Sequence, residues 1–112
     1  MEVEQLPEEQ VLVVVSGEID LYTAPQLKEA LDAGLEAGAR GLVVDLTEVT
    51  FVDSTALGVL IGAAKRLHAA DGSLAIVCPN VKVRHIFQVT GLDRVLGVCA
   101  TRQEALSAAA SG

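Results

Sequence analysis

The stretch FVDSTALG, residues 51–58, lies between two apolar segments of the chain. It places an acid and two hydroxyls, Asp53, Ser54 and Thr55, in the most hydrophobic part of the sequence. From Ser54 to about Ala70 the sequence reads as a helix, and Asp and Ser are preferred residues at a helix N-cap. The stretch therefore predicts the junction between a buried strand and a helix, with a polar group at the helix start.

The two faces of this helix differ in composition. At about 100° per residue, one face carries the apolar stripe expected to pack on the core: Leu57, Leu60, Ile61, Ala64 and Leu67. The opposite face, with Ser54 near its edge, carries Thr55, Gly58, Val59, Gly62, Ala63 and Arg66. Each of its glycines costs about 1 kcal/mol of helix propensity relative to Ala. The pattern leaves two readings open: an uncharged docking surface, or packing against a neighbouring helix of the same domain.

The segments before the junction alternate between strand and helix patterns. EVEQL (2–6) and VLVVVSG (11–17) predict a hairpin. Thr23 and Gln26 have capping-box spacing and open a predicted helix from about 24 to 37. LVVDL (42–46) is apolar on both faces, which is typical of a central strand covered on each side.

The same alternation continues after the junction. DGSLAIVC (71–78) predicts a turn and a strand, and Asn80 a cap for a short helix that Gly91 ends. That helix carries Val83, Ile86 and Phe87. VLGVC (95–99) predicts the last strand. Thr101 and Glu104 then open a final alanine-rich helix, with a frayed tail at SAAASG (107–112).

Composition and order together predict the fold class. The 112 residues are 51% hydrophobic and 3% aromatic, which is enough for one aliphatic core and too short for a second domain. We expect one α/β domain over residues 1–112, with a small mixed β-sheet, an N-terminal hairpin and about four α-helices packed on the sheet.

Charge and hydropathy argue against several classes of partner. The net charge of −7 opposes phosphate backbones, so we expect no nucleic acid. No apolar run reaches the roughly 20 residues that span a bilayer, and the start MEVEQLPEEQ is unlike a signal peptide, so we expect no membrane contact and a cytoplasmic location. Cys78 and Cys99 lack a metal-binding spacing and are expected to be buried free thiols.

The chemistry open to Ser54 is narrow. GxSxG is absent, and nothing places a histidine beside Ser54, so a hydrolase is disfavoured. A phosphate on Ser54 would lie at a helix N-terminus, where N–H groups and the helix dipole favour an anion. It would add about −1.5 to −2 charge to a largely uncharged face, and would change what that face can bind.

Three segments resemble one family over residues 10 to 106. FVDSTALGVLIGAAKRL (51–67) is similar to the signature of the anti-sigma factor antagonists, the bacterial STAS domains. GEIDLYTAPQLKEAL (17–31) resembles the first strand-to-helix segment of the family, and IFQVTGLDRVL (86–96) its late helix and turn. Many members have Gly where this chain has Ala56, a change that adds one methyl group and favours the helix.

The resemblance implies partner switching. The unphosphorylated antagonist binds an anti-sigma factor with a histidine-kinase-like ATPase fold, which releases the sigma factor. That same partner phosphorylates the serine after the motif aspartate, here Ser54, and a metal-dependent serine phosphatase reverses the modification. The resemblance also implies that a partner-binding surface includes Asp20, Asp53, Ser54, Thr55, Gly58, Val59, Gly62 and Arg66.

Two other readings stay open. Asp45, at the end of LVVDL, has the position of the acceptor in an aspartyl-phosphate receiver, but the acidic pair and the lysine of that mechanism are absent from the expected places. The chain is also compatible with a constitutive STAS scaffold or a ligand-binding module of a stress-signalling assembly. No GxxxxGK or GxGxxG follows a strand, so we expect no cofactor, no metal and no enzymatic activity.

Overall fold

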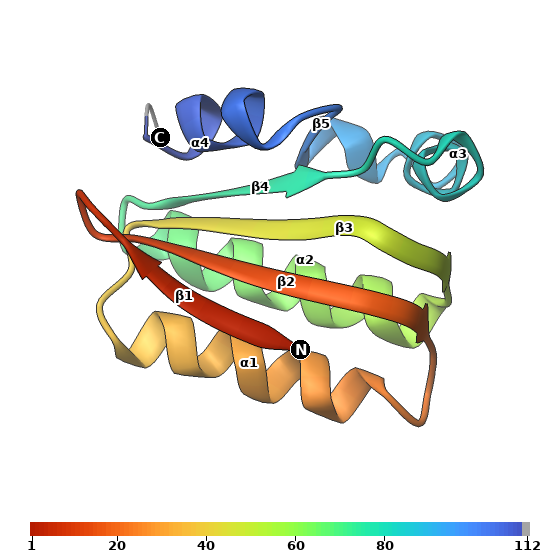
Figure 1. Cartoon of the computed structure of the whole chain (residues 1–112), viewed down its shortest axis with the longest axis horizontal. Coiled ribbons are helices and arrows are strands. Elements are labelled where there is room, and N and C mark those ends of the chain that lie inside the picture. The colour runs from red at the N-terminus through yellow and green to blue at the C-terminus, as the bar shows by residue number, and fades with distance from the viewer. Residues whose placement is uncertain (111–112) are drawn as a thin grey trace.

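A mixed sheet with helices on both faces organises residues 1–110, the part of the chain that the computed structural model describes (Figure 1). The strands lie side by side in chain order, β1-β2-β3-β4-β5. Their bounds are β1 Glu2–Leu6, β2 Gln10–Ile19, β3 Gly41–Val52, β4 Ser73–Val77 and β5 Gly97–Cys99. The helices are α1 Ala24–Glu36, α2 Ser54–Ala69, α3 Val81–Val89, the short 3₁₀ helix η1 Leu92–Arg94 and α4 Arg102–Ala110.

The strand directions follow from the connections. β1 and β2 form the predicted antiparallel hairpin, in which Leu6 pairs with Gln10. β2, β3, β4 and β5 are parallel neighbours, so each pair needs a crossover rather than a turn. The crossovers contain α1, α2 and α3 in turn. The predicted mixed sheet and hairpin are confirmed.

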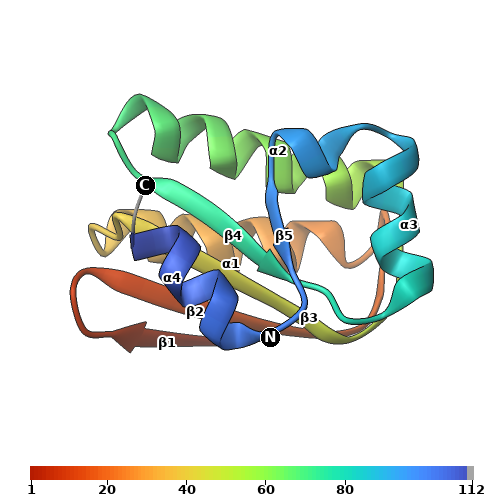
Figure 2. The same cartoon turned by 90° about the horizontal axis from the view of Figure 1, so that it is seen from above.

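Each face of the sheet has its own apolar core. α1 and α2 cover one face, where they pack on Val13 and Val44 together with Phe87 of α3. α4 lies across the other face, where Ala105 packs near Val43 (Figure 2). Because β2 to β4 are covered on both sides, the strands are almost continuous apolar runs.

The N-terminal cap of α1 differs from the prediction. Thr23 does occupy the cap position, but its side chain makes no capping hydrogen bond. Its hydroxyl instead accepts a bond from the Asp20 N–H at 2.9 Å and donates one to the Glu18 carbonyl at 3.1 Å. The capping-box prediction for Thr23 and Gln26 is therefore wrong, because the preceding turn takes up the hydroxyl.

Strand lengths also differ from the sequence pattern. β3 does not end with LVVDL but continues to Val52, pairing along the second half of β2 after register shifts. β5 begins at Gly97 because Val95 still belongs to the end of η1. The predicted boundaries of α2, α3 and β4 agree with the structure, and Gly91, at φ 74°, follows the end of α3.

The frayed tail predicted for 107–112 is wrong as far as Ala110, where α4 ends. Ala109 is buried, and its carbonyl accepts a hydrogen bond from the Ser73 hydroxyl at 2.8 Å. These contacts fix the last turn of α4 on the sheet. Residues 111 and 112 lie outside the described residues.

The parallel strands point the same way, so their carboxyl ends meet at one end of the molecule. Asp20 follows β2, Asp53 follows β3 and Asn80 follows β4. Figure 1 shows this end on the right, where α2 and α3 begin. None of the helices found in residues 1–110 combines the length and the apolar character needed to cross a bilayer.

Candidate functional site

The junction between β3 and α2 is organised by Asp53. Its backbone is extended, and its Oδ1 accepts a hydrogen bond from the Ala56 N–H at 3.0 Å, so Asp53 is the N-cap of α2. Its own N–H donates to the Ile19 carbonyl at 3.0 Å, which holds the ends of β2 and β3 together. Of the two candidate caps in the sequence, Asp53 performs this role.

Ser54 is left with a spare hydroxyl. It is the first residue of α2, it is exposed, and among residues 1–110 its side chain has no hydrogen-bond partner. The first N–H groups of a helix lack intrahelical partners, and the helix dipole makes this end partly positive. The Ser54 oxygen is therefore accessible to a reagent in solution, at a position where an added anion is tolerated.

Asp20 borders the same place but is engaged in a turn. Its Oδ1 accepts bonds from the N–H groups of Tyr22 at 2.9 Å and Thr23 at 3.1 Å. The Asp53–Ile19 backbone bond places this turn next to the start of α2. Asp20 thus shapes the β2–α1 loop and adds a carboxylate near Ser54.

The outward face of α2 lines a groove beside α1. The groove has a volume of about 300 Å³ and contains, from α2, Thr55, Gly58, Val59, Gly62, Ala63 and Arg66. From α1 it contains Lys28, Leu31 and Asp32. α1 packs beside α2, so the internal-packing reading holds in part, and because an open groove remains between the two helices the docking reading stays a prediction.

Two positions on α2, Ile61 and Ala63, differ from the helical-wheel prediction. Ile61 is only half-buried, whereas Ala63 is buried. Ala63 was expected on the outward face. It is covered because α1 approaches α2 on that side, a packing partner that the periodicity of α2 alone does not contain.

An ion-pair network bridges the two helices at the groove. Asp32 of α1 accepts bonds from Lys28 at 2.7 Å and from Arg66 of α2 at 2.5 Å. The hydrogen bond from Lys28, joined by that from Arg66, holds the pKa of the Asp32 carboxyl below its ordinary value. Two cations thus share one carboxylate at this edge of the groove.

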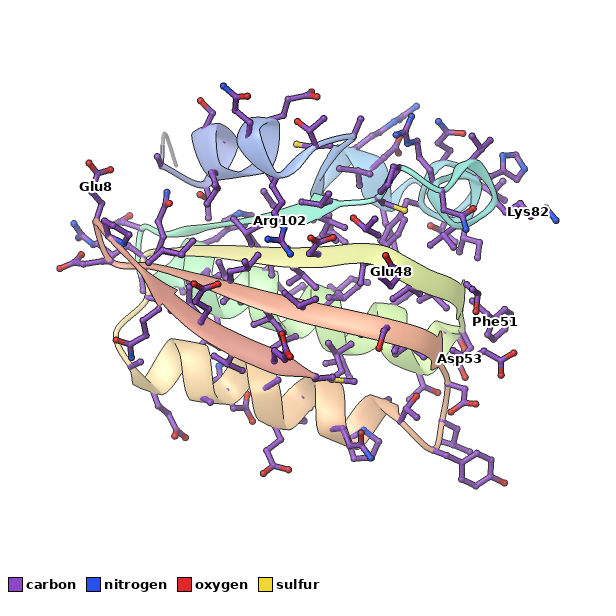
Figure 3. All side chains as sticks on the ribbon, viewed as in Figure 1. Glu8, Glu48, Phe51, Asp53, Lys82 and Arg102 are labelled. Carbon is purple, nitrogen blue, oxygen red and sulfur yellow. The ribbon has the colours of Figure 1, made fainter. Side chains whose placement is uncertain are left out.

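Sequence reasoning missed four exposed large apolar side chains at the end of the sheet where α2 and α3 begin: Leu21, Tyr22, Phe51 and Val81. Tyr22 is 86% exposed, and the other three are also open to solvent. Figure 3 shows Phe51 next to Asp53 at the end of the sheet where α2 begins. Soluble domains seldom gather several exposed large apolar side chains without a partner. Apolar residues directly after a predicted strand, as in GEIDLYT, were the available signal.

Asp45 is not placed as a receiver acceptor. β3 continues past it, and its side chain, 5% exposed, faces α4. It accepts bonds from the Thr47 N–H and hydroxyl at 2.9 and 2.5 Å and from Arg102 Nε at 2.6 Å (Figure 3 labels Arg102). Burial alone raises the pKa of Asp45, but these bonds outweigh it and hold the pKa below its ordinary value. Asp45 therefore has a structural role.

The cysteines and the acids form no metal site within the described residues. Cys78 is buried as predicted, but Cys99 is only partly buried. Cys78 directly follows β4 and Cys99 ends the neighbouring strand β5, but they pack in different cores on opposite faces of the sheet, so they are not placed to form a disulfide. Burial raises the pKa of both thiols, which disfavours the reactive thiolate.

The fold and site define a small α/β domain with an exposed hydroxyl at the start of α2, directly after the capping residue Asp53. The STAS domain family model matches residues 1–105, and the chain belongs to this family. The anti-sigma-B factor antagonist of Listeria monocytogenes is 36% identical over 98 residues, covering 88% of this chain and 86% of the relative.

Solved structures agree with this assignment. An anti-sigma factor antagonist from Mycobacterium paratuberculosis is 32% identical, with a TM-score of 0.87 over 96% of this chain and 91% of the other. The phosphorylated form of the Bacillus cell fate determinant SpoIIAA is 24% identical, with a TM-score of 0.72 over 95% and 96% of the two chains. The similarity to SpoIIAA, at 24% identity, supports the fold alone.

Proposed function

We propose that this protein is an anti-sigma factor antagonist whose partner binding is switched by phosphorylation of Ser54. Three observations support the proposal: the family assignment, relatives named as anti-sigma factor antagonists at 32% and 36% identity, and the geometry of the β3–α2 junction. The single observation that carries the switch is the exposed Ser54 hydroxyl, spare because Asp53 caps the helix.

The partner is an anti-sigma factor with a histidine-kinase-like ATPase fold, which also acts as the serine kinase. Its contact surface on this chain includes Asp20, Asp53, Ser54, Thr55, Gly58, Val59, Gly62 and Arg66, all near the start of α2 or along its groove face. Binding of the unphosphorylated form releases the sigma factor. A metal-dependent serine phosphatase restores this form, and the chain itself supplies the acceptor hydroxyl and no catalytic group.

Electrostatics explain how one phosphate ends the interaction. The helix N-terminus tolerates the new anion, so the domain stays folded. The added charge of about −1.5 to −2 lies beside Asp53 and near Asp20, on a chain whose net charge is already −7. A partner surface that matched the neutral hydroxyl must then desolvate a phosphate among carboxylates, which costs binding free energy.

The test compares wild type, Ser54→Ala and Ser54→Asp in titrations against the purified anti-sigma factor of the source cell. We expect Ser54→Ala to bind like wild type and Ser54→Asp to bind at least a hundredfold more weakly, a difference of about 3 kcal/mol. Ser16→Asp adds the same charge at an exposed serine of β2 and serves as the matched control. Incubation with the anti-sigma factor and ATP should phosphorylate wild type and leave Ser54→Ala unmodified.

The outcomes separate a switch from a scaffold. Equal binding by Ser54→Ala and Ser54→Asp would contradict the switch and favour a constitutive STAS scaffold. Equal weakening by Ser16→Asp and Ser54→Asp would attribute the effect to net charge rather than to the site.

A further inference from the structure

We infer that the α1–α2 groove is a socket for one apolar side chain of the anti-sigma factor, with an acidic group of that partner beside it. This inference rests on the proposed function and adds the chemistry of the contact. It follows from the two groove glycines, from the size and position of the groove and from the charges at its edge.

Gly58 and Gly62 have no structural reason to be glycine in the isolated chain. Both lie inside α2 in helical backbone, and a Cβ built on either would meet no atom within 4 Å. Neither position therefore needs a small residue for packing or a left-handed φ. Alanine would favour the helix at both places. What the glycines do provide is empty space on the groove wall, which points to something outside the chain that fills it.

The groove is continuous with the switch. Gly58 and Gly62 follow Ser54 by 4 and 8 residues, which is about 6 and 12 Å along the helix axis at 1.5 Å per residue. One partner segment laid along α2 from Ser54 thus passes over both glycines. The volume of about 300 Å³ is at the lower limit of the roughly 300–1,000 Å³ found for small-molecule pockets, so it suits a side chain better than a cofactor.

The edge of the groove selects the charge of its occupant. Lys28 and Arg66 both bond to Asp32, and their side chains are more than half exposed. Two cations against one carboxylate leave a local excess of positive charge on a chain with net charge −7. An aliphatic or aromatic side chain flanked by Asp or Glu complements this edge, whereas a basic flank is repelled.

The experiment fills the socket without touching Ser54. Gly62→Ala and Gly62→Leu are titrated against the anti-sigma factor of the source cell, and Tm and the rate of Ser54 phosphorylation are measured in parallel. We expect Gly62→Ala to raise Tm by a few degrees and yet weaken binding about tenfold. Gly62→Leu should weaken it more than a hundredfold. Ala69→Leu, at an exposed position of α2 outside the groove, is the matched control and should bind like wild type.

A charge variant tests the second half of the inference. Arg66→Glu should weaken binding at least tenfold at low salt, and raising the salt concentration should narrow its gap to wild type. If wild type binds and Gly62→Leu binds equally well, the socket is wrong and the proposed function stands. If Arg66→Glu binds like wild type, the acidic flank is wrong. If wild type itself binds no anti-sigma factor, the proposed function fails and the socket fails with it.

Discussion

Asp45 and Ser54 both follow apolar stretches of the sequence, but their hydrogen bonding in the structure gives them opposite roles. Asp45, inside β3, is 3% exposed, and Thr47 and Arg102 satisfy its carboxylate. Ser54 directly follows Asp53, the N-cap of α2; it is exposed, and its side chain has no hydrogen-bond partner in residues 1–110. A polar group whose bonds are all made within the chain stabilises the fold, whereas one left open is available to another molecule.

Arg102→Ala should show the largest effect on folding. It removes the charged partner of a buried carboxylate, so we expect a loss of about 2 kcal/mol in the free energy of unfolding. This is less than the roughly 3–5 kcal/mol for breaking a fully buried pair, because Arg102 is about half exposed and water can replace it. Urea unfolding at pH 7 measures the loss.

Ser54→Ala supplies the other side of this comparison. It removes an exposed hydroxyl without a partner in the described residues, so its free energy of unfolding should stay within about 0.5 kcal/mol of wild type. If Ser54→Ala destabilised the domain as much as Arg102→Ala does, the hydroxyl would be a structural group. The contrast drawn between the two residues would then be lost.

Asp53→Ala should have an intermediate effect, because Asp53 is structural and also borders the site. Losing its bond to the Ala56 N–H should cost about 1 kcal/mol, as at other helix caps. Asn80→Ala removes the equivalent bonds at the start of α3 and gives a matched loss at a residue that does not line the groove. If both variants lose the same stability but only Asp53→Ala also loses partner binding, the capping role of Asp53 and its role in the partner contact are separated.

The sequence predicted the features of the fold that local patterns encode. The hairpin, the order of strands and helices and the strand-to-helix junction at Asp53 come from apolar periodicity and from cap and turn residues that act over a few positions. The errors had two causes. The Thr23 hydroxyl is taken up by Glu18 and Asp20 in the adjacent turn, a local alternative to the capping box. The last turn of α4 is held by a distant residue, Ser73 of β4.

The candidate site was predictable to a similar degree. Helical geometry placed Gly58, Gly62 and Arg66 on one face with Ser54 near its edge, and this holds. The wall from α1 and the Asp32 ion pairs were not predictable, because α2 does not encode which helix packs beside it. Phe51 and Val81 were missed because exposure at the end of a strand or the start of a helix depends on what covers that end.

The dependence of stability on pH separates Asp45 from other acids. Its pKa is lowered in the folded state, because the hydrogen bonds and the charge of Arg102 exceed the opposing effect of burial. The stabilisation is therefore complete above the unfolded pKa of about 3.9 and is lost as pH falls through the lower folded value. Urea unfolding from pH 6 down to pH 2.5 should show wild type losing stability in this window more steeply than Asp45→Asn.

A matched variant tells whether Arg102 is the cause of this slope. In Arg102→Ala the burial of Asp45 is less well opposed, so the loss of stability below about pH 4 should become shallower than in wild type. Asp32→Asn removes another carboxyl whose pKa is lowered, but it should leave the difference between wild type and Arg102→Ala intact, since Lys28 and Arg66 bind Asp32 on the other face of the sheet. An unchanged slope in both Asp45→Asn and Arg102→Ala would mean that Asp45 titrates alike in the folded and unfolded chains. Its bonds to Thr47 and Arg102 would then not be what separates it from Ser54.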